Sequence, residues 1–497
     1  MRSRKRLQRN VSDTTPSRKP RPVVAPAPEP TLAVVGGGLA GLGAAAAAVE
    51  NGLHVELFEQ GRHLGGRAGA FRDPKTKTPI DRCPHVAMGC CTNFLDFCRR
   101  TGVAGHLSTF RRLQFLSPDG KRHDFAPSRW LPAPLHLLPA LLRLGQLRFG
   151  ARLSIARAAW RLAREPAELS ADGETIAAWL RRNGQSQRAI DRFWAPVLVS
   201  ALSERLDRAS LAAAKKVLAD GFLGSRRACE LIVPKVPLGE ILDRDVGAWL
   251  EKQGVRVYRR TGIERIEADR RRATGLLLRD GSRRAFDAVV LAVPWNRVTR
   301  LLPEPVQEAG PELREAGKLP PAPITGVHLW FDRPITPLPH AVLVERLTQW
   351  VFNRGPQPVS TTAGDPSGHC YQIVISASHE QVGRPREELL RKVLADLSAV
   401  WPVARGADLL HSRVITQPAA VFSPSPGVDL LRPVQQTPIA NLALAGDWTA
   451  TGWPATMESA VRSGYLAVEA VLESLRNDRR LLVPDLPRGW LARGMLG

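Results

Sequence analysis

The sequence predicts an α/β fold with a dinucleotide-binding unit near its N-terminus, and three observations support this. A short β-rich run that begins at Thr31 is followed by three glycines and then by an Ala-rich helical stretch up to Val49. A second short apolar run, HVELFE, ends in Glu59. Further strand-like runs recur between residues 255 and 293, and a last helix is expected over 455–475. Short strands that alternate with longer helices are typical of a parallel sheet covered by helices.

The composition limits the class of protein. The 497 residues are 44% apolar and 24% charged, which excludes a wholly disordered, collagen-like or multi-span membrane chain. Lysine and arginine number 70 against 47 acidic residues, a net charge of +23. This excess favours anionic partners, nucleic acid or the negative leaflet of the cytoplasmic membrane, although an Arg-rich coding bias would also explain it. We expect no nucleic-acid role, since the chain has no zinc spacing or reader motif.

The N-terminal segment gives no targeting signal. Residues 1–30 are basic and proline-rich without an apolar period, so we expect a disordered tail. They hold no apolar core of a secretory signal, and six cysteines make no disulfide scaffold, so we expect a reducing cytoplasm. The stretch 31–49 is about long enough to span a bilayer, but its glycines divide it into strand, turn and helix.

Residues 36–41 (GGGLAG) fit the pattern G-x-G-x-x-G. Gly36 permits the tight turn out of the strand, Gly38 lets the backbone approach a pyrophosphate, and Gly41 allows helix and strand to pack closely. The helix that begins here directs free N–H groups at the phosphates. Glu59, at the end of the second strand, can accept hydrogen bonds from both ribose hydroxyls. A Gly-rich packing turn is the alternative, but the strand, the helix and the carboxylate together favour a nucleotide site.

A glycine pair and an arginine, Gly65, Gly66 and Arg67, follow the acidic residue, where a simple NAD-binding unit needs none. This run resembles the second phosphate-side turn of the FAD proteins related to amine oxidases, phytoene desaturases and protoporphyrinogen oxidase. The resemblance continues in AGDW at 445–448 and in GWPATMESAVRSG at 452–464. It implies a Rossmann-type FAD-binding domain built from three discontinuous segments. We expect the FAD to be non-covalent, because the C-terminal block holds no cysteine.

The same resemblance assigns residues to the cofactor. It implies that Asp447 holds the ribityl chain, that Ile263 contacts the adenine, and that the helix starting around Thr456 points its N-terminus at the flavin pyrimidine. The expected cofactor-binding residues are Gly36, Gly38, Leu39, Ala40, Gly41, Glu59, Gln60, Arg62, Gly65, Gly66, Arg67, Ile263, Gly446, Asp447, Thr456, Met457 and Glu458.

The segments then divide into domains. We expect residues 31–110, 221–300 and 432–475 to form the FAD-binding domain. Residues 111–220 and 301–431 would form a mixed α+β domain for substrate and membrane contact, and 476–497 a C-terminal extension.

A narrower resemblance lies in residues 81–91 (DRCPHVAMGCC), which are similar to the D-x-x-x-H-V-x-x-G-C block of the squalene-associated FAD-dependent desaturases. These are hydroxysqualene dehydroxylases of hopanoid biosynthesis. WLPAPLH at 130–136, VPKVPLG at 233–239 and the block at 446–465 fit the same family. The resemblance implies that a C30 isoprenoid alcohol loses water and gains a hydride from reduced FAD, giving squalene, in a dry apolar channel. The electron donor is not readable from the sequence.

Asp81 and His85 are the candidate catalytic residues, since ionising the alcohol needs an acid near the leaving oxygen and a histidine can deliver a proton. In the alternative interpretation Asp81 pins a loop and His85 is a satisfied buried imidazole. We expect no metal site, because Cys83, Cys90, Cys91 and Cys98 contain no C-x2-C pair. Only three tyrosines are present, which disfavours the paired aromatic rings of amine oxidases.

Two other functions stay open. One is a carotenoid or apocarotenoid desaturase, which runs the flavin in the oxidative direction. The other is a non-catalytic FAD-binding membrane partner of a squalene pathway.

Membrane contact is expected at a Leu-rich run and the amphipathic helix that follows it, between Leu131 and Leu162. One face of that helix carries Ile155, Ala158, Ala159 and Leu162, and the other carries Arg157, Arg161 and Arg164. Such a helix suits the inner face of the cytoplasmic membrane, to which the protein would bind peripherally. An ordinary substrate-domain helix with its charged face in water is the alternative.

Overall fold

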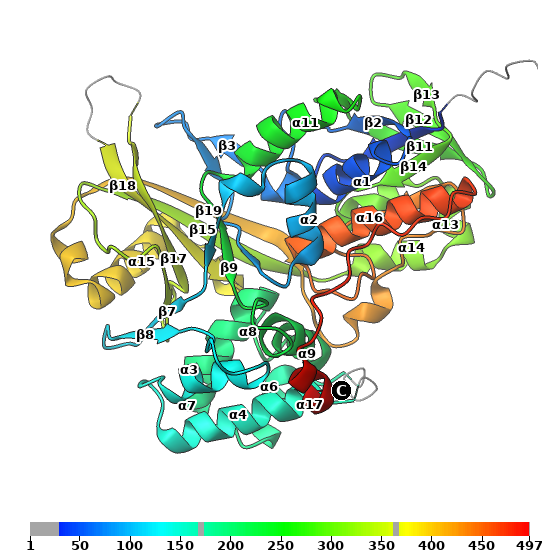
Figure 1. Ribbon diagram of the computed structural model, residues 1–497. Helices are drawn as coiled ribbons and strands as arrows, with labels where there is room; N and C mark the ends of the chain where they lie inside the picture. The colour runs from blue at the N-terminus through cyan, green and yellow to red at the C-terminus, as the bar shows by residue number, and fades with distance from the viewer. Residues whose placement is uncertain (1–28, 167–172, 361–366, 497) are drawn as a thin grey trace, which may run out of the picture.

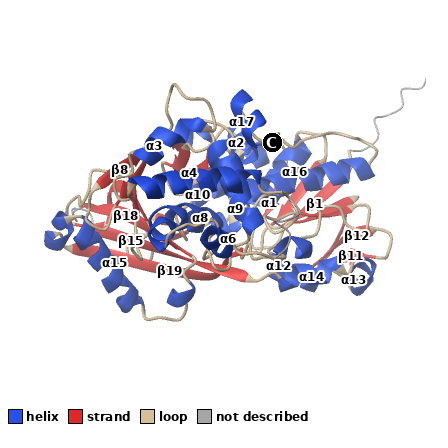
Figure 2. Cartoon of the chain, turned by 90° about the horizontal axis from the view of Figure 1, so that it is seen from below, coloured by secondary structure: helices blue, strands red, loops and turns tan. Residues whose placement is uncertain are grey.

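The computed structural model describes residues 29–166, 173–360 and 367–496, so the predicted N-terminal tail lies outside it except for its last two residues. Figure 1 shows three parts: an α/β part that holds the N-terminal strands, a broad curved sheet beside it, and a helical part below both. Seen from below, the strands gather at the two ends of the molecule with helices between them (Figure 2).

The α/β part is built on a five-stranded sheet in which every neighbouring pair is parallel. In spatial order its strands are β10 (Arg256–Tyr258), β2 (His54–Phe58), β1 (Thr31–Val35), β14 (Ala288–Leu291) and β20 (Leu442–Leu444). The strands are short, and all but the edge strand β10 are almost wholly buried because helices or strands cover both faces, as expected of a parallel sheet. The predicted α/β class with a Rossmann-type sheet is therefore confirmed.

Two helices distant in sequence cover one face of this sheet. α1 (Leu39–Val49) packs along α16 (Met457–Ser474), and Gly464 lies where a Cβ would come within 2.4 Å of the Ala40 carbonyl oxygen. The stretch that is long enough to span a bilayer is thus β1 followed by α1. No helix in the described ranges combines the length and apolarity needed to cross a bilayer.

The opposite face is covered by a small antiparallel sheet and short helices, which share a core with Val35 and Phe58. These elements are β11 (Ile263–Ala268), β12 (Ala273–Leu278), β13 (Arg283–Ala285), α12 (Trp295–Leu301), α13 (Glu304–Ala309) and α14 (Glu312–Glu315).

The curved sheet has seven strands, and α15 (Arg386–Val400) covers one of its faces. In spatial order the strands are β19 (Leu409–Phe422), β15 (Pro321–Phe331), β18 (Ser367–Ser376), β17 (Trp350–Pro358), β16 (His340–Leu343), β7 (Leu113–Leu116) and β8 (Arg122–Phe125). Only the pair β16 and β7 is parallel. Two further small sheets, β3 (Ala70–Arg72) with β4 (Pro79–Asp81) and β5 (Ala87–Met88) with β9 (Leu231–Pro234) and β6 (Leu107–Phe110), join the parts.

The helical part has its own apolar core. Its main helices are α3 (Leu138–Leu142), α4 (Phe149–Arg164), α6 (Ile176–Arg182), α8 (Ala195–Leu202) and α9 (Leu211–Leu218), with single π-helical turns η4 (Ile190–Trp194) and η5 (Ala219–Leu223). The predicted amphipathic helix is α4, but Ile155, Ala158 and Leu162 are buried in this core. The apolar face chosen from the sequence is therefore unavailable to lipid, which corrects that expectation.

The C-terminal segment connects the parts. After α16 the chain runs down to the helical part, where α17 (Trp490–Leu496) ends beside α4 (Figure 1). The backbone N–H groups of Leu481 and Leu482 donate to Glu469, and Ala492 is fully buried. The predicted extension is thus packed over much of its length.

Candidate active site

A cavity of about 630 Å³ begins at the carboxyl ends of β1 and β2 and continues between the curved sheet and the helical part. Its far end is walled mainly by apolar side chains from the curved sheet, the helical part and β9. They include Leu113, Phe115, Phe222, Leu231, Phe352 and Val374. A long hydrocarbon can be buried there away from water.

The glycine turn leaves room for a diphosphate. Gly36, with φ +113°, turns the chain out of β1, and a Cβ on Gly41 would lie 1.9 Å from the Gly36 carbonyl oxygen. At Gly38 a Cβ would meet nothing nearer than the Gly66 Cα, 4.0 Å away, so this backbone stands open to the cavity. Leu39, Ala40, Gly65, Gly66 and Arg67 line the same space.

Glu59 is fixed at the end of β2. Its carboxylate accepts hydrogen bonds from the backbone N–H of Gly37 at 2.9 Å and of Gly61 at 2.6 Å. The side chain lines the cavity beside Gln60 and Ile263. This is the position at which a carboxylate meets the ribose of a bound dinucleotide.

The N-terminus of α16 opens onto the cavity. Thr456 caps the helix by accepting from the Ser459 N–H at 3.1 Å, and both Thr456 and Met457 line the cavity with Gly446. Asp447 is buried there and pairs with the Arg67 guanidinium. The open turn, the carboxylate and the positive end of this helix are the features that FAD needs, so the residues fit the cofactor.

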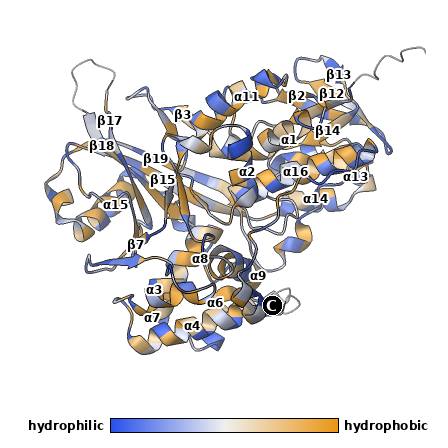
Figure 3. Ribbon diagram, viewed as in Figure 1, coloured by the Kyte–Doolittle hydropathy of each residue, from blue (hydrophilic) through white to orange (hydrophobic). Residues whose placement is uncertain are grey.

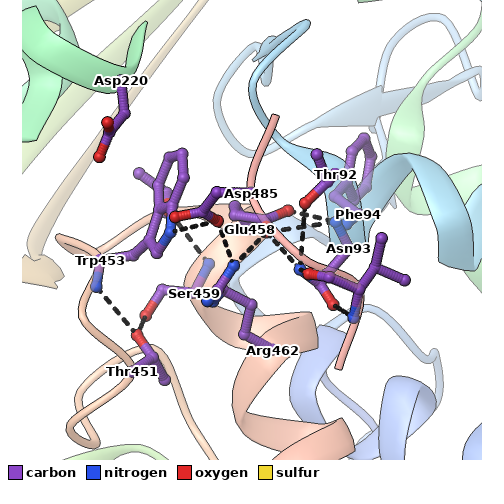
Figure 4. Close-up of polar contacts among 12 residues, drawn as sticks. Thr92, Asn93, Phe94, Asp220, Thr451, Trp453, Glu458, Ser459, Arg462 and Asp485 are labelled. Carbon is purple, nitrogen blue, oxygen red and sulfur yellow. Dashed lines mark hydrogen bonds and ion pairs between the residues drawn. The ribbon is translucent and has the colours of Figure 1, made fainter. Parts of the chain in front are cut away.

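Glu458 lies elsewhere than expected. Its buried carboxylate accepts from the N–H of Asn93 at 3.2 Å, from the Asn93 side-chain amide at 2.8 Å and from the N–H of Phe94 at 2.9 Å (Figure 4). It therefore caps α2 (Thr92–Arg100) and does not line the cavity. Burial raises the pKa of this carboxyl, although the two N–H groups oppose the shift.

Two more expected cofactor residues do not line the cavity. Gly41 lies beneath the turn, where it serves the close packing that the motif requires. Arg62 is exposed.

His85 lines the cavity and is half-buried. Its Nδ1 atom has no hydrogen-bond partner among the described residues. Burial lowers the pKa of the imidazole to about 4, and the nearby Arg67 charge adds to this. At neutral pH the ring is therefore neutral.

Asp81 holds two segments together. Its buried carboxylate accepts from the N–H of Leu238 at 3.0 Å and of Gly239 at 2.9 Å, and it does not line the cavity. Burial raises the pKa of this carboxyl to about 6, against the effect of the two N–H groups. The structure thus does not bring Asp81 to the substrate space, contrary to the catalytic role expected beside His85.

Some cavity residues carry no signal in the sequence. Lys216 lies on the wall, with its Nζ 2.7 Å from Asp220, 3.1 Å from Asp485 and 4.8 Å from the centre of the Trp453 ring. Trp453 stands in the C-terminal block and could have been found there. Lys216 is one lysine in an ordinary amphipathic helix, and Asp485 lies in a segment with no motif, so only the fold brings them together. Figure 4 shows Asp485 beside Trp453.

Among the described residues, cysteine side chains line the cavity and tyrosine side chains do not. Cys83, Cys90, Cys91 and Cys229 line the cavity, and burial raises the pKa of Cys83 and Cys229 to about 12, which keeps these thiols neutral. In the described part of the chain no tyrosine lines the cavity, and no three His, Cys, Asp or Glu side chains are placed to hold a metal ion.

The glycine turn, the ribose carboxylate and the helix N-terminus of a Rossmann-type domain all open into a mainly apolar cavity. This arrangement defines an FAD-dependent oxidoreductase. Residues 39–472 match the flavin containing amine oxidoreductase family, and the chain belongs to it.

Curated relatives span most of the chain at low identity. The 15-cis-phytoene desaturase of Solanum lycopersicum is 25% identical over 472 residues, covering 92% of this chain and 80% of the relative. The hydroxysqualene dehydroxylase of Sinorhizobium fredii is 27% identical over 451 residues, covering 88% and 97%. Among solved structures, an oxidoreductase from Methanosarcina mazei superposes with a TM-score of 0.67 at 19% identity, covering 89% of this chain and all of that one, and shares the fold.

Proposed function

We propose that this protein catalyses the reductive dehydroxylation of hydroxysqualene to squalene. The observation that carries the proposal is the cavity, which joins a cofactor-binding turn to walls made mainly of hydrocarbon side chains. A C30 isoprenoid has one polar group and otherwise needs only apolar burial. The similarity to a relative named hydroxysqualene dehydroxylase, which extends over 97% of that relative, supports the choice of substrate.

In the proposed reaction the allylic C–O bond breaks, the hydroxyl takes a proton and leaves as water, and a hydride adds to the carbon. Reduced FAD, when bound, supplies the hydride. The apolar walls exclude water that would otherwise return the cation to the alcohol. The net change consumes one hydroxysqualene, one hydride and one proton, and it yields one squalene, in which a C–H bond replaces the C–O bond, and one water.

His85 has the position and chemistry to serve the leaving hydroxyl. Its neutral ring lines the cavity, where it can hold the hydroxyl by a hydrogen bond. Its low pKa makes the protonated ring a strong acid, so delivery of the proton is fast once that form is populated. Asp81 acts on this site only by holding the 81–91 segment to the turn at Gly239.

A carotenoid desaturase is the second candidate. The similarity to phytoene desaturase over 92% of this chain favours it, and the same apolar cavity would accept a carotenoid precursor. The two activities run the cofactor in opposite redox directions, which makes them separable by experiment.

The test is an anaerobic titration of the purified protein with its FAD reduced by light. Addition of hydroxysqualene should reoxidise the flavin and yield squalene in equal amount. Reoxidation without squalene, or no reoxidation, contradicts the proposal. If phytoene instead bleaches the oxidised flavin, the desaturase is favoured. A flavin that responds neither to hydroxysqualene nor to phytoene indicates a non-catalytic binding partner.

A further inference from the structure

The exposed aromatic side chains are concentrated at one end of the molecule. Trp130, Phe149, Trp160 and Trp490 are 91%, 62%, 47% and 71% exposed, and no other Trp, Phe or Tyr in the described ranges is exposed. All four belong to the helical part or to the C-terminal helix that packs on it. Isolated exposed apolar residues need no explanation, but a group of large rings at one end does.

The rings lie on adjoining elements. Phe149, Leu153 and Trp160 follow one another at helical spacing along α4, away from its buried face, and Leu153 is 47% exposed. α17 is held against α4 by a hydrogen bond from Arg164 to the Met495 carbonyl at 3.0 Å. In Figure 3 the segment α4, at the lower edge of the molecule, carries both hydrophobic and hydrophilic stretches.

The segments that carry Trp130 and Trp490 contact each other. A Cβ on Gly489 would stand 3.6 Å from the Cβ of Ala133, and Ala133 and Ala492 share one small buried cluster. The loop that carries Trp130 is held by a hydrogen bond from Arg226 to the Arg129 carbonyl at 2.8 Å.

The same surface is strongly basic. Residues 125–164 contain no Asp or Glu, and their arginines are Arg129, Arg143, Arg148, Arg152, Arg157, Arg161 and Arg164. Arg157, Arg161 and Arg164 line a surface cleft of about 380 Å³ with Trp160, Asn183 and Glu165. An anionic bilayer binds aromatic rings that lie at the level of its headgroups and guanidinium groups that reach its phosphates.

Only one turn of helix separates this surface from the cavity. Gly221 and Phe222 of η5 line the cavity, whereas Ala219 of the same turn packs with Ala133 and Ala492 beneath the exposed rings. A substrate dissolved in the bilayer would therefore leave it close to the apolar end of the cavity.

We propose that the docking face, formed by Trp130, Phe149, Leu153, Trp160 and Trp490 with Arg148, Arg157 and Arg161, binds the surface of an anionic lipid bilayer. The inference deepens the proposed function by naming the phase from which the isoprenoid is taken. Only the identity of the isoprenoid taken from the bilayer rests on the proposed function, since a desaturase would also take its hydrocarbon substrate from lipid.

The test is flotation of the FAD-loaded full chain with vesicles of phosphatidylcholine alone or mixed with about one third phosphatidylglycerol. The wild type should float with the anionic vesicles and release at high salt. W130S/F149S/W160S and R148E/R157E/R161E should each lower binding at least about tenfold, because both ring insertion and charge attraction are needed.

Two control variants match these changes elsewhere. V403S/L430S/V434S removes exposed apolar side chains, and R265E/R271E/R283E makes the same charge change on β11 to β13, at the far end of the molecule. Both should bind within about twofold of the wild type. Retained flavin absorbance shows that every variant is folded.

The proposal is overturned if the wild type does not float, if docking-face variants behave like their controls, or if the rings instead hold a dimer that W130S/F149S/W160S dissociates. Turnover of detergent-dispersed hydroxysqualene is measured in parallel. If the protein converts hydroxysqualene but does not float, the proposed function stands and the docking face is wrong. If it floats but does not convert hydroxysqualene, the docking face stands and the proposed function is wrong.

Discussion

At the scale of single residues, glycines shape the cofactor end of the cavity because they leave backbone atoms uncovered by side chains. Gly38 faces open space, Gly41 faces a carbonyl oxygen, and Glu59 is fixed by two N–H groups. The open backbone at Gly38 and the close packing at Gly41 were expected from one short motif, whose geometry is local, and Glu59 was expected at the end of the next strand. The two N–H groups that fix Glu59 were not expected.

Gly38→Val should therefore place a branched side chain where the diphosphate lies. We expect FAD affinity to fall at least about tenfold with little loss of stability. Gly105→Val is the matched control, since a Cβ there meets nothing within 4 Å and Gly105 lies away from the cavity. The measurement is the flavin absorbance of purified protein titrated with FAD. Equal affinity in the two variants would contradict the placement of the turn.

His85 gives a prediction with a definite sign. Because burial lowers the pKa of its ring to about 4, the protonated fraction grows about tenfold for each pH unit between 7 and 5. If this ring delivers the proton, kcat/KM should rise as the pH falls and level off near pH 4. His85→Gln should keep FAD, lose turnover and lose this dependence. A wild-type rate that is flat or falls over this range would remove the ring from proton delivery.

Glu458 marks the limit of prediction at this scale. An acid at the first turn of α16 suits the helix dipole, so the sequence gives no reason to look further. Its partners, Asn93 and Phe94, are more than 360 residues away in the chain. Contacts of that separation carry no local pattern.

At the scale of elements, strands and helices with a clear period were predictable. β1 begins at Thr31 and α1 ends at Val49, the bounds that their sequence patterns indicate. α4 was harder because it has two apolar stripes, one with Ile155 and one with Leu153 and Trp160. Periodicity finds both stripes, but only the packing of the other helices decides which one is buried.

Asp81 is tested at this scale because it joins β4 to the start of α10 (Leu238–Glu240). Asp81→Ala leaves two buried N–H groups without an acceptor and should lower the free energy of unfolding by about 2–3 kcal/mol. Turnover per bound FAD should change far less than in His85→Gln. The measurements are urea denaturation and turnover normalised to flavin. Undiminished stability with lost turnover would instead make Asp81 catalytic.

At the scale of the whole molecule, the C-terminal segment ties the α/β part to the helical part. Asp485 accepts from Arg462 at 2.6 Å and from Lys216 at 3.1 Å, and it contacts the Trp453 indole N–H at 3.3 Å. Although burial alone would raise it, the two cations hold the pKa of this carboxyl below its usual range. Nothing in residues 476–497 predicts this role, since it depends on α9 and α16 meeting in the fold.

Asp485→Ala should accordingly lower the free energy of unfolding by about 1–3 kcal/mol and loosen Trp453 at the cavity wall. Asp478→Ala, in the exposed part of the same segment, should have almost no effect. Thermal unfolding followed separately by flavin fluorescence and by circular dichroism measures both effects. Identical transitions in the two variants would show that the segment does not join the parts.

The central claim is that a hydride meets an isoprenoid carbon in a water-free cavity, and deuterium labelling tests it most directly. The transferable hydrogen of reduced flavin exchanges with solvent, so anaerobic turnover of hydroxysqualene in D2O should give squalene with one deuterium on the carbon that bore the hydroxyl. A product without deuterium, or one with an additional double bond, would contradict the account.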